Sequence, residues 1–399
     1  MSLRVLVLSG AIAAAAGSGP GLLLAQRAPV EAAWDLLAQG QRKQAIDTLH
    51  KILSVNPEDA DARLLLGSIL AEDGVRPESI EQLAEAVRLR PRSAEAQNAL
   101  GEAFNAFGES KMARAAFAKA VALDPAFAAA QVNLGQILVE AKEFDAASEH
   151  LDRALRSLGT SPDAALAHYL RAKVNTEHNE TQEAVRHLEQ AVSLRPDFAE
   201  AWSDLGQARK TLLDSAGALI AFQKAVAASP DDAVSQYRLG SEYLQRGEGL
   251  PAIQHLEKSL QLTPDDQSTL FALQIAYRRN GQLERAAEMK ARLTGLLRKR
   301  DEAAQHALAA VQINNEGAAL EKAGNLHGAL EKYRAALDLS PEHVGIRVNY
   351  AAALLHLGQL NEGILELREA LRRDPDNSAI RQALDRALAK VSPDRGGKQ

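Results

Sequence analysis

The side chains that could carry out chemistry are scattered along this sequence. His150, His168, His178 and His187 lie in one stretch, but their spacing is not that of metal ligands on one helix face. Without cysteine the chain has no disulfide and no thiolate metal site. The short patterns of zinc peptidases, phosphate-binding loops and serine hydrolases are also absent. We therefore expect no catalytic residue, no metal site and no cofactor, and a protein that is not an enzyme.

The composition indicates close-packed helices. The chain has 399 residues, of which 46% are hydrophobic and only 4% aromatic, and alanine and leucine dominate the apolar set. Strands favour β-branched and aromatic residues, so an all-α fold is expected. The length exceeds that of one ordinary core, which predicts several domains or a repeat array. A net charge of −6 argues against a nucleic-acid partner.

The first residues have the layout of a secretory signal peptide. Arg4 precedes an apolar run over residues 5–16, and small residues follow. We expect a signal peptide over residues 1–25, with cleavage after Ala25 or earlier, around residues 16–18. The alternative is an uncleaved anchor, which the glycines and the proline of residues 10–21 disfavour. The protein is then exported, periplasmic or secreted, with no membrane span after the signal is removed.

The prolines mark a period of 34 residues. Pro57, Pro91 and Pro125 follow this spacing, as do the set Pro162, Pro196, Pro230 and Pro264 and the pair Pro341 and Pro375. Most prolines follow a small residue by twelve positions: Ala45, Ser79, Ala113, Ala184, Ala218, Ala252, Ala329 and Gly363. Eight positions before the proline stands a large apolar residue: Leu49, Leu83, Phe117, Leu188, Phe222, Leu256, Tyr333 and Leu367. The interval from Pro125 to Pro162 is longer, and in that repeat Ala147 and Leu151 take these places. Leu-Gly pairs such as Leu205-Gly206 stand earlier in the repeats.

This pattern resembles the tetratricopeptide repeat (TPR) family over residues 26–391. Each repeat is expected to form two amphipathic helices, with the glycine and alanine positions allowing close approach and the proline setting the turn. The resemblance implies an all-α TPR solenoid, a right-handed superhelix of antiparallel helix pairs. Neighbouring repeats then bury a continuous core, because no single repeat can bury its own apolar face.

Two departures from the period define the expected domains. About three residues are inserted near residues 156–160, which predicts a longer turn. The interval from Pro264 to Pro341 is 77 residues and includes a basic segment. We expect a TPR array of about eight repeats over 26–297, a basic linker helix over 298–309 and two further repeats over 310–375. A capping helix over 376–391 and a disordered tail over 392–399 complete the chain.

The resemblance implies a concave groove lined by the first helix of each repeat. Its expected peptide-binding residues are Tyr169, Lys173, Gln207, Lys210, Tyr237, Phe271 and Arg278. Aromatic anchors and polar groups suit an extended peptide. For Tyr169, Tyr237 and Phe271, packing between repeats is the equal alternative. Trp202, Tyr243 and Tyr277 occupy positions where the family packs aromatic residues, and there a structural role is expected.

Two known specialisations of the family do not fit. The carboxylate clamp for chaperone tails needs lysine and asparagine in one repeat, where this chain has Asn98 and Glu102 ahead of Asn133. The asparagine ladder of some sugar-transferase arrays needs asparagine in successive repeats. Asn315 and Asn349 give two rungs, but the central repeats interrupt the ladder.

The leading hypothesis is a non-enzymatic scaffold or adaptor that binds protein or peptide partners through the groove in an exported compartment. The alternative is an accessory subunit of an envelope enzyme or export complex that docks through Arg298, Lys299 and Arg300, although charge runs are usually solvated helix faces. An enzyme with an unrecognised site is the third hypothesis. The repeats leave no segment long enough for a catalytic domain, which argues against it.

Overall fold

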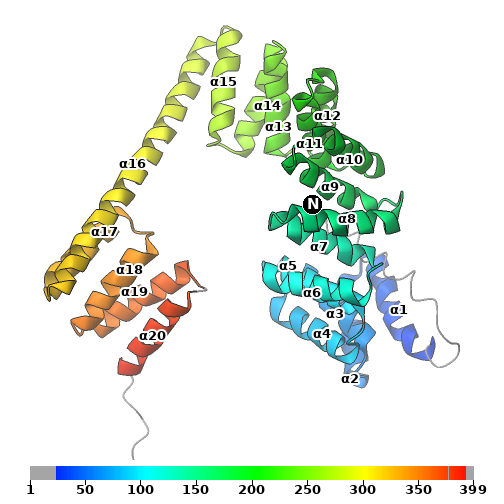
Figure 1. Ribbon diagram of the computed structural model, residues 1–399, viewed down its shortest axis with the longest axis horizontal. Helices are drawn as coiled ribbons and strands as arrows, with labels where there is room; N and C mark the ends of the chain where they lie inside the picture. Colours follow the sequence, from blue (N-terminus) through cyan, green and yellow to red (C-terminus); the bar gives the residue numbers. More distant parts are fainter. Residues whose placement is uncertain (1–23, 376, 392–399) are drawn as a thin grey trace, which may run out of the picture. The chain divides into compact units, whose positions relative to one another are not determined.

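The structure is a computed structural model that describes residues 24–375 and 377–391. Every element in this part of the chain is an α-helix, and α1 to α20 follow one another as a solenoid (Figure 1). The all-α prediction is therefore confirmed. The expected tail over 392–399 lies outside the described residues, as does the expected signal peptide except for its last two residues.

The chain divides into two compact units, residues 1–264 (unit 1) and 265–399 (unit 2). Unit 1 consists of helices of 13 to 15 residues that alternate in direction. They are α1 (Leu24–Ala38), α2 (Arg42–Val55), α3 (Ala60–Glu72), α4 (Arg76–Leu89), α5 (Ala94–Ala106), α6 (Ser110–Leu123), α7 (Ala128–Glu140), α8 (Phe144–Leu158), α9 (Ala164–Glu177), α10 (Thr181–Leu194), α11 (Ala199–Thr211), α12 (Ser215–Ala228), α13 (Ala233–Gln245) and α14 (Gly249–Leu262).

Unit 2 contains one helix far longer than the rest. Its elements are α15 (Gln267–Arg279), α16 (Leu283–Lys322), α17 (Leu326–Leu339), α18 (Val344–His356), α19 (Leu360–Arg373) and α20 (Ser378–Val391). The 40 residues of α16 pack against both α15 and α17. The expected capping helix corresponds to α20, which buries Ile380, Leu384 and Ala387 in a cluster with residues of α19.

The unit boundary differs from the one that the sequence suggested at 298–309. Residues 283–322 contain no proline, so α16 continues through that stretch without a break. Because α16 packs against α15 on one side and α17 on the other, α15 to α20 group together. The division lies instead between Pro264 and Asp265.

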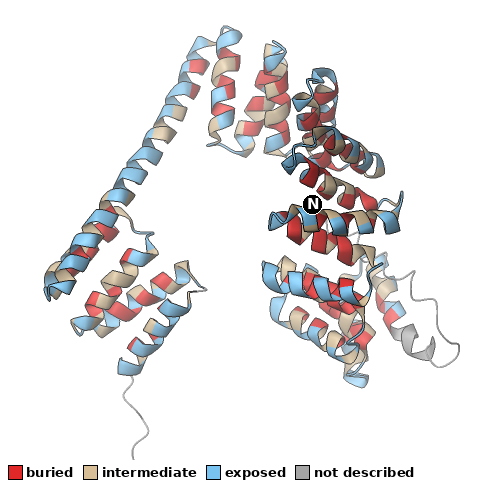
Figure 2. Cartoon of the chain, in the orientation of Figure 1, coloured by how far each residue is buried: buried red, intermediate tan, exposed pale blue. Residues whose placement is uncertain are grey.

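In several repeats, a glycine of the first helix accommodates a large side chain of the second. A β-carbon at Gly206 would lie 2.5 Å from the Phe222 ring, and one at Gly101 would lie 2.6 Å from Phe117. The large residues predicted from the period are all buried, and so are the small ones beside them (Figure 2). Close backbone approach around a buried large residue therefore holds each helix pair together.

The turn inside each helix pair requires a left-handed residue. Glycine takes this conformation in most repeats, for example Gly74, Gly108 and Gly247. Lys142, Asn179 and Leu213 take it instead in three successive repeats of unit 1. The insertion near residues 156–160 extends α8 to Leu158 and ends in a left-handed glycine, Gly159, as the longer turn predicts.

The turn between repeats is closed by a side chain six residues after the proline, which donates a hydrogen bond to the proline carbonyl. We call this contact the turn clasp. Its donors are Arg63 Nε to Pro57 (2.8 Å), Gln131 Nε2 to Pro125 (2.8 Å), Trp202 Nε1 to Pro196 (2.8 Å), Gln236 Nε2 to Pro230 (2.8 Å), Arg347 Nη2 to Pro341 (2.6 Å) and Arg381 Nη2 to Pro375 (2.5 Å). The clasp satisfies a backbone carbonyl of the turn, one residue beyond the C-cap of the preceding helix. Trp202 is half-buried because its indole serves this contact at the edge of the repeat.

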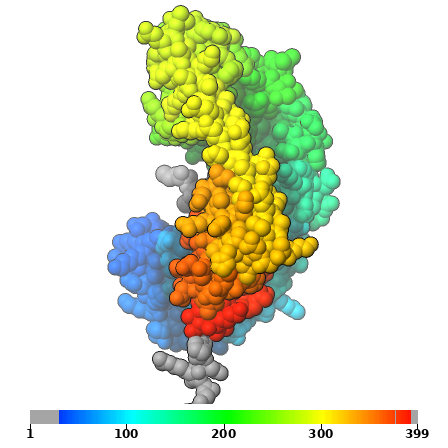
Figure 3. Space-filling view, turned by 90° about the vertical axis from the view of Figure 1, so that its left-hand side faces the viewer, coloured from blue at the N-terminus to red at the C-terminus, as the bar shows by residue number. Residues whose placement is uncertain are grey.

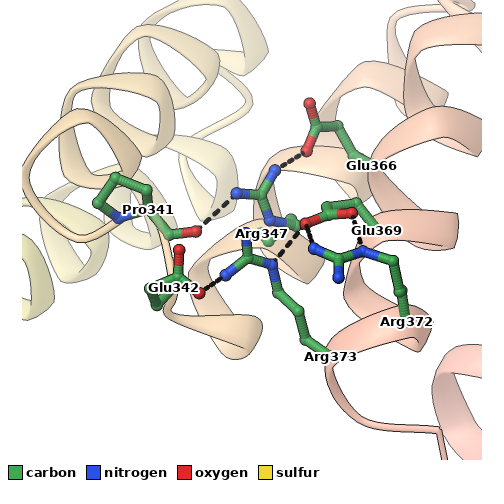
Figure 4. A network of polar contacts seen from close by, with 7 residues as sticks. All are labelled: Pro341, Glu342, Arg347, Glu366, Glu369, Arg372 and Arg373. Carbon is green, nitrogen blue, oxygen red and sulfur yellow. Dashed lines mark hydrogen bonds and ion pairs between the residues drawn. The ribbon is translucent and has the colours of Figure 1, made fainter.

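The clasp position also contacts the second helix of its own repeat, nineteen residues further on. These clasp pairs are Arg63 with Gln82 (2.7 Å), Gln131 with His150 (2.7 Å), Gln236 with His255 (2.8 Å) and Arg347 with Glu366. Figure 4 shows Arg347 between the Pro341 carbonyl and Glu366, with Glu369 held by two arginines beside it. Each of these pairs matches a hydrogen-bond donor with an acceptor.

No helix among the described residues is long and apolar enough to cross a membrane.

Candidate binding surface

The first helices of neighbouring repeats in unit 1 contact one another directly, as α3 does α5, α5 does α7, α7 does α9 and α11 does α13. We call the surface that these helices share the first-helix face. Across this face, contacts join residues that are 35 apart in the sequence. This is one residue more than the 34-residue repeat, so a residue contacts the one that follows its equivalent in the next repeat. Its polar side chains are therefore organised between repeats.

A line of polar contacts crosses α9, α11 and α13. The Tyr169 hydroxyl donates to Asp204 Oδ2 at 3.2 Å, and Arg238 Nη1 donates to Asp204 Oδ1 at 2.9 Å. The same Arg238 nitrogen lies 2.8 Å from Ser203 Oγ. Asp204 thus accepts from both neighbouring repeats, which fixes its carboxylate before any ligand arrives.

Tyr169 serves both structure and surface. Its ring lies 4.8 Å from the ring of the buried Phe198, and Lys173 Nζ lies 5.7 Å from its centroid on the other helix turn. Burial raises the pKa of the Tyr169 hydroxyl, and the nearby Asp204 carboxylate raises it further. The hydroxyl therefore stays a neutral donor, and the exposed Lys173 beside it remains available to a partner.

Of the other expected groove residues of unit 1, Gln207 is exposed on α11 and Tyr237 is half-buried on α13. Lys210 has a different role. Its Nζ lies 3.4 Å from Glu242 Oε2, and Glu242 is only 1% exposed. Ser215 Oγ donates to the other carboxylate oxygen at 2.7 Å. Lys210 compensates a buried charge, so we do not count it among the residues free to bind a ligand.

Phe271 and Arg278 lie on α15, in unit 2. Phe271 is 54% exposed, and the side chain of Arg278 is exposed as well. They share a helix of unit 2, whereas the other expected groove residues belong to unit 1.

A second polar cluster on the first-helix face joins α5 and α7. Asn133 Nδ2 lies 3.0 Å from both Asn98 Oδ1 and Glu102 Oε1, and Asn98 Nδ2 donates to the same Glu102 oxygen at 3.0 Å. Burial raises the pKa of Glu102, and the two amide hydrogen bonds oppose that rise only in part. An equivalent contact in unit 2 joins Asn349 Nδ2 to Asn314 Oδ1 at 2.9 Å, so the rung is Asn314 rather than Asn315.

The basic linker residues lie in the middle of α16. All residues from 298 to 306 are exposed, and this part of the helix forms open surface in the yellow region of Figure 3. Arg298 lies 3.5 Å from Glu302 and Arg300 lies 3.7 Å from Asp301. Exposed pairs of this kind are worth ~0–1 kcal/mol, so they leave the arginines able to exchange partners.

Sequence reasoning missed Asp204 and Arg238, the centre of the polar line. They stand one position after the expected groove positions of their repeats, beside Ser203 and Tyr237. The signal that could have found them is an acid and a base 34 residues apart in adjacent first helices. Among the described residues, no group of three or more histidines, aspartates and glutamates could hold a metal ion.

Comparison with known proteins agrees with this architecture. Sequence models described as tetratricopeptide repeat match residues 36–103 and 320–387, 94–127, 127–197 and 169–233. The TPR repeat-containing thioredoxin TTL4 of Arabidopsis thaliana is 38% identical over 73 residues, which are 18% of this chain. The chain spans 11% of the length of that relative.

Solved structures are similar to this chain as well. PilF of Pseudomonas aeruginosa is similar with a TM-score of 0.50 and 20% identity, over 53% of this chain and 94% of that one. YrrB, described as a TPR protein with an unusual peptide-binding site, is similar with a TM-score of 0.40 and 23% identity, over 48% of this chain and 98% of that one. At these identities the likeness concerns the fold alone.

Proposed function

Because this chain belongs to the tetratricopeptide repeat family, we propose that it is a scaffold without enzymatic activity that binds an extended segment of a protein partner. The proposed binding surface is the first-helix face of α9, α11 and α13. The observation that carries the proposal is the line from Tyr169 through Asp204 to Arg238, with exposed Lys173 and Gln207 beside it.

An extended peptide presents backbone donors and acceptors at regular intervals, together with alternating side chains. Gln207 supplies an amide that can both donate and accept, and Lys173 supplies a cation. Tyr169 and Arg238 hold Asp204 in place, so little side-chain freedom is lost when a peptide docks. The surface therefore suits a polar peptide that carries an acidic group for Lys173.

Selection from a displayed library of random peptides on the full-length chain tests this function. Enriched peptides are then measured by calorimetry against the wild type, Gln207→Ala and Arg238→Gln. Lys224→Ala is the matched control, because Lys224 is an exposed residue of the second helix α12. We expect Arg238→Gln to weaken binding about tenfold or more, since it frees Asp204 and removes a central cation. Equal affinity for all four proteins would place the binding surface elsewhere.

A second candidate function is docking of an acidic partner along α16. It is supported by the unbroken exposure of residues 298–306 and by the three basic side chains at the start of that stretch. Polyglutamate is a suitable probe. Lys299→Glu should weaken its binding more than the same reversal at Lys224 does. Equal losses of polyglutamate affinity in the two variants would show that only the net charge of the protein matters.

We also propose that the protein is exported, with residues 1–25 as its signal. Support comes from the sequence of that segment. Cell fractionation with N-terminal sequencing of the mature protein tests it. A mature chain that starts at Gln26, or near residue 18, agrees with export. A chain that keeps residues 1–25 and stays in the cytosol rules export out.

A further inference from the structure

One clasp pair of unit 1 differs from the others in its chemistry. The corresponding positions of the repeat formed by α9 and α10 hold His168 and His187, nineteen residues apart. The pairs at Gln131 and His150 and at Gln236 and His255 join an amide oxygen to an imidazole. Here two imidazoles face each other, and neither has a dedicated acceptor as its partner.

The two rings meet through equivalent nitrogens. His168 Nδ1 lies 2.9 Å from His187 Nδ1, with ring centroids 5.2 Å apart and ring planes inclined at 41°. For this contact to be a hydrogen bond, one Nδ1 must carry a proton and donate it, and the other Nδ1 must accept it through its lone pair. Both rings are half-buried, so the solvent reaches this site without any rearrangement of the helices.

The surroundings keep both imidazoles neutral. Burial lowers the pKa of His168, and burial together with the neighbouring His168 and Arg171 lowers that of His187 to about 4. A neutral imidazole is the form that ligates metal ions. When both Nδ1 atoms ligate, the ring that donates in this contact takes the tautomer with its proton on Nε2. Asp152 offsets part of the positive field, since its carboxylate lies 2.9 Å from Arg171 Nε.

We propose that His168 and His187 form a binding site for a divalent transition-metal ion, with the two Nδ1 atoms as neighbouring ligands and water completing the coordination. Metal–imidazole bonds are about 2.0–2.1 Å long, so nitrogens 2.9 Å apart subtend about 90° at the metal. That angle fits adjacent positions of a tetragonal or octahedral ion better than a tetrahedral one. Ni²⁺ and Cu²⁺ are therefore favoured over Zn²⁺.

The repeats themselves supply the matched variant. His168→Gln converts this pair into the Gln–His pair found at residues 131 and 150 and at 236 and 255, so the fold is expected to tolerate it. His187→Gln gives the reverse pair and serves as a second test if the first variant unfolds. His255→Gln removes an imidazole from a clasp pair that has only one, and is the control.

Calorimetric titration of the untagged full-length chain with NiCl₂ and CuCl₂ tests the site, together with thermal melts and Cu²⁺ electron paramagnetic resonance. We expect one equivalent to bind to the wild type and to His255→Gln, with nitrogen couplings from two imidazoles and a higher melting temperature. His168→Gln and His187→Gln should bind at least about tenfold more weakly, because each loses one of two protein ligands. Unchanged affinity in these folded variants, or no binding by the wild type, overturns the proposal.

Discussion

At the scale of single residues, one turn position has a strained backbone conformation. Leu213 adopts the left-handed conformation with φ of 63°, and its side chain is 91% exposed. A left-handed conformation costs a residue with a β-carbon roughly 1–2 kcal/mol, although asparagine tolerates it. The preceding repeat has asparagine, Asn179, in the same conformation.

We expect Leu213→Asn to raise the free energy of unfolding by about 0.5–1 kcal/mol, because it relieves this strain and exposes no buried surface. Chemical denaturation measures the change. Leu250→Asn is the control, since Leu250 is 63% exposed but lies in α14. That variant should be neutral or slightly destabilising. A similar gain from both variants would show that surface polarity, not backbone strain, is responsible.

The half-buried carboxyl of Glu102 gives a prediction about pH. Its folded pKa is raised, so its contribution to stability is fully present below the unfolded pKa and is lost as the pH rises through the folded pKa. Glu102→Gln keeps the oxygen that accepts from Asn98 and Asn133 and removes the charge. We expect the variant to melt higher than the wild type at neutral pH, with the difference shrinking toward pH 4. A difference that grows on acidification would contradict the raised pKa.

At the scale of helices, the contact between a glycine and a large residue makes a paired prediction. Gly206→Ala should destabilise the protein by about 1–3 kcal/mol, because the new β-carbon meets the Phe222 ring at 2.5 Å. Gly295→Ala should stabilise it by up to ~1 kcal/mol, because Gly295 lies within α16 with no atom within 4 Å of the added carbon. Thermal unfolding of both variants separates steric cost from helix propensity. Equal effects would mean that the ring moves aside freely.

Much at this scale could be predicted from the sequence. Proline, small and large residues recur at fixed spacing, and each marks a local requirement of a helix pair, so the helices and their buried faces follow from them. Contacts across repeats could not be predicted in the same way. Lys210 stands at a groove position of its repeat, but in the structure it pairs with the buried Glu242 of the next repeat. The repeat pattern gives no sign of this acid, because the equivalent positions of the preceding repeats hold Ala208 and Val174. The basic segment was predicted to be a helix over 298–309, and it lies within α16, which extends from Leu283 to Lys322.

At the scale of the whole molecule, the two compact units should respond separately to local damage. Tyr333 is 1% exposed, fills the space beside Gly317 and donates to Glu321 at 2.7 Å. Tyr333→Ala should cost about 3–5 kcal/mol. Because solenoid contacts are local, we expect faster amide hydrogen exchange in α16 to α19 and unchanged exchange in α3 to α13. Equal loss of protection in both units would show that they unfold as one.

The spacing of contacts on the first-helix face has a consequence for how such an array can change over time. Stacking follows the 34-residue period, whereas the polar partners Tyr169 and Asp204, like Asn98 and Asn133, stand 35 residues apart in adjacent repeats. Each of these contacts therefore needs two adjacent repeats. Duplication or loss of one repeat preserves the packing and brings unfamiliar side chains together at the junction. The array can thus vary in length at little cost to folding. Each duplication or loss of a repeat also changes the polar side chains that the first-helix face presents to a partner.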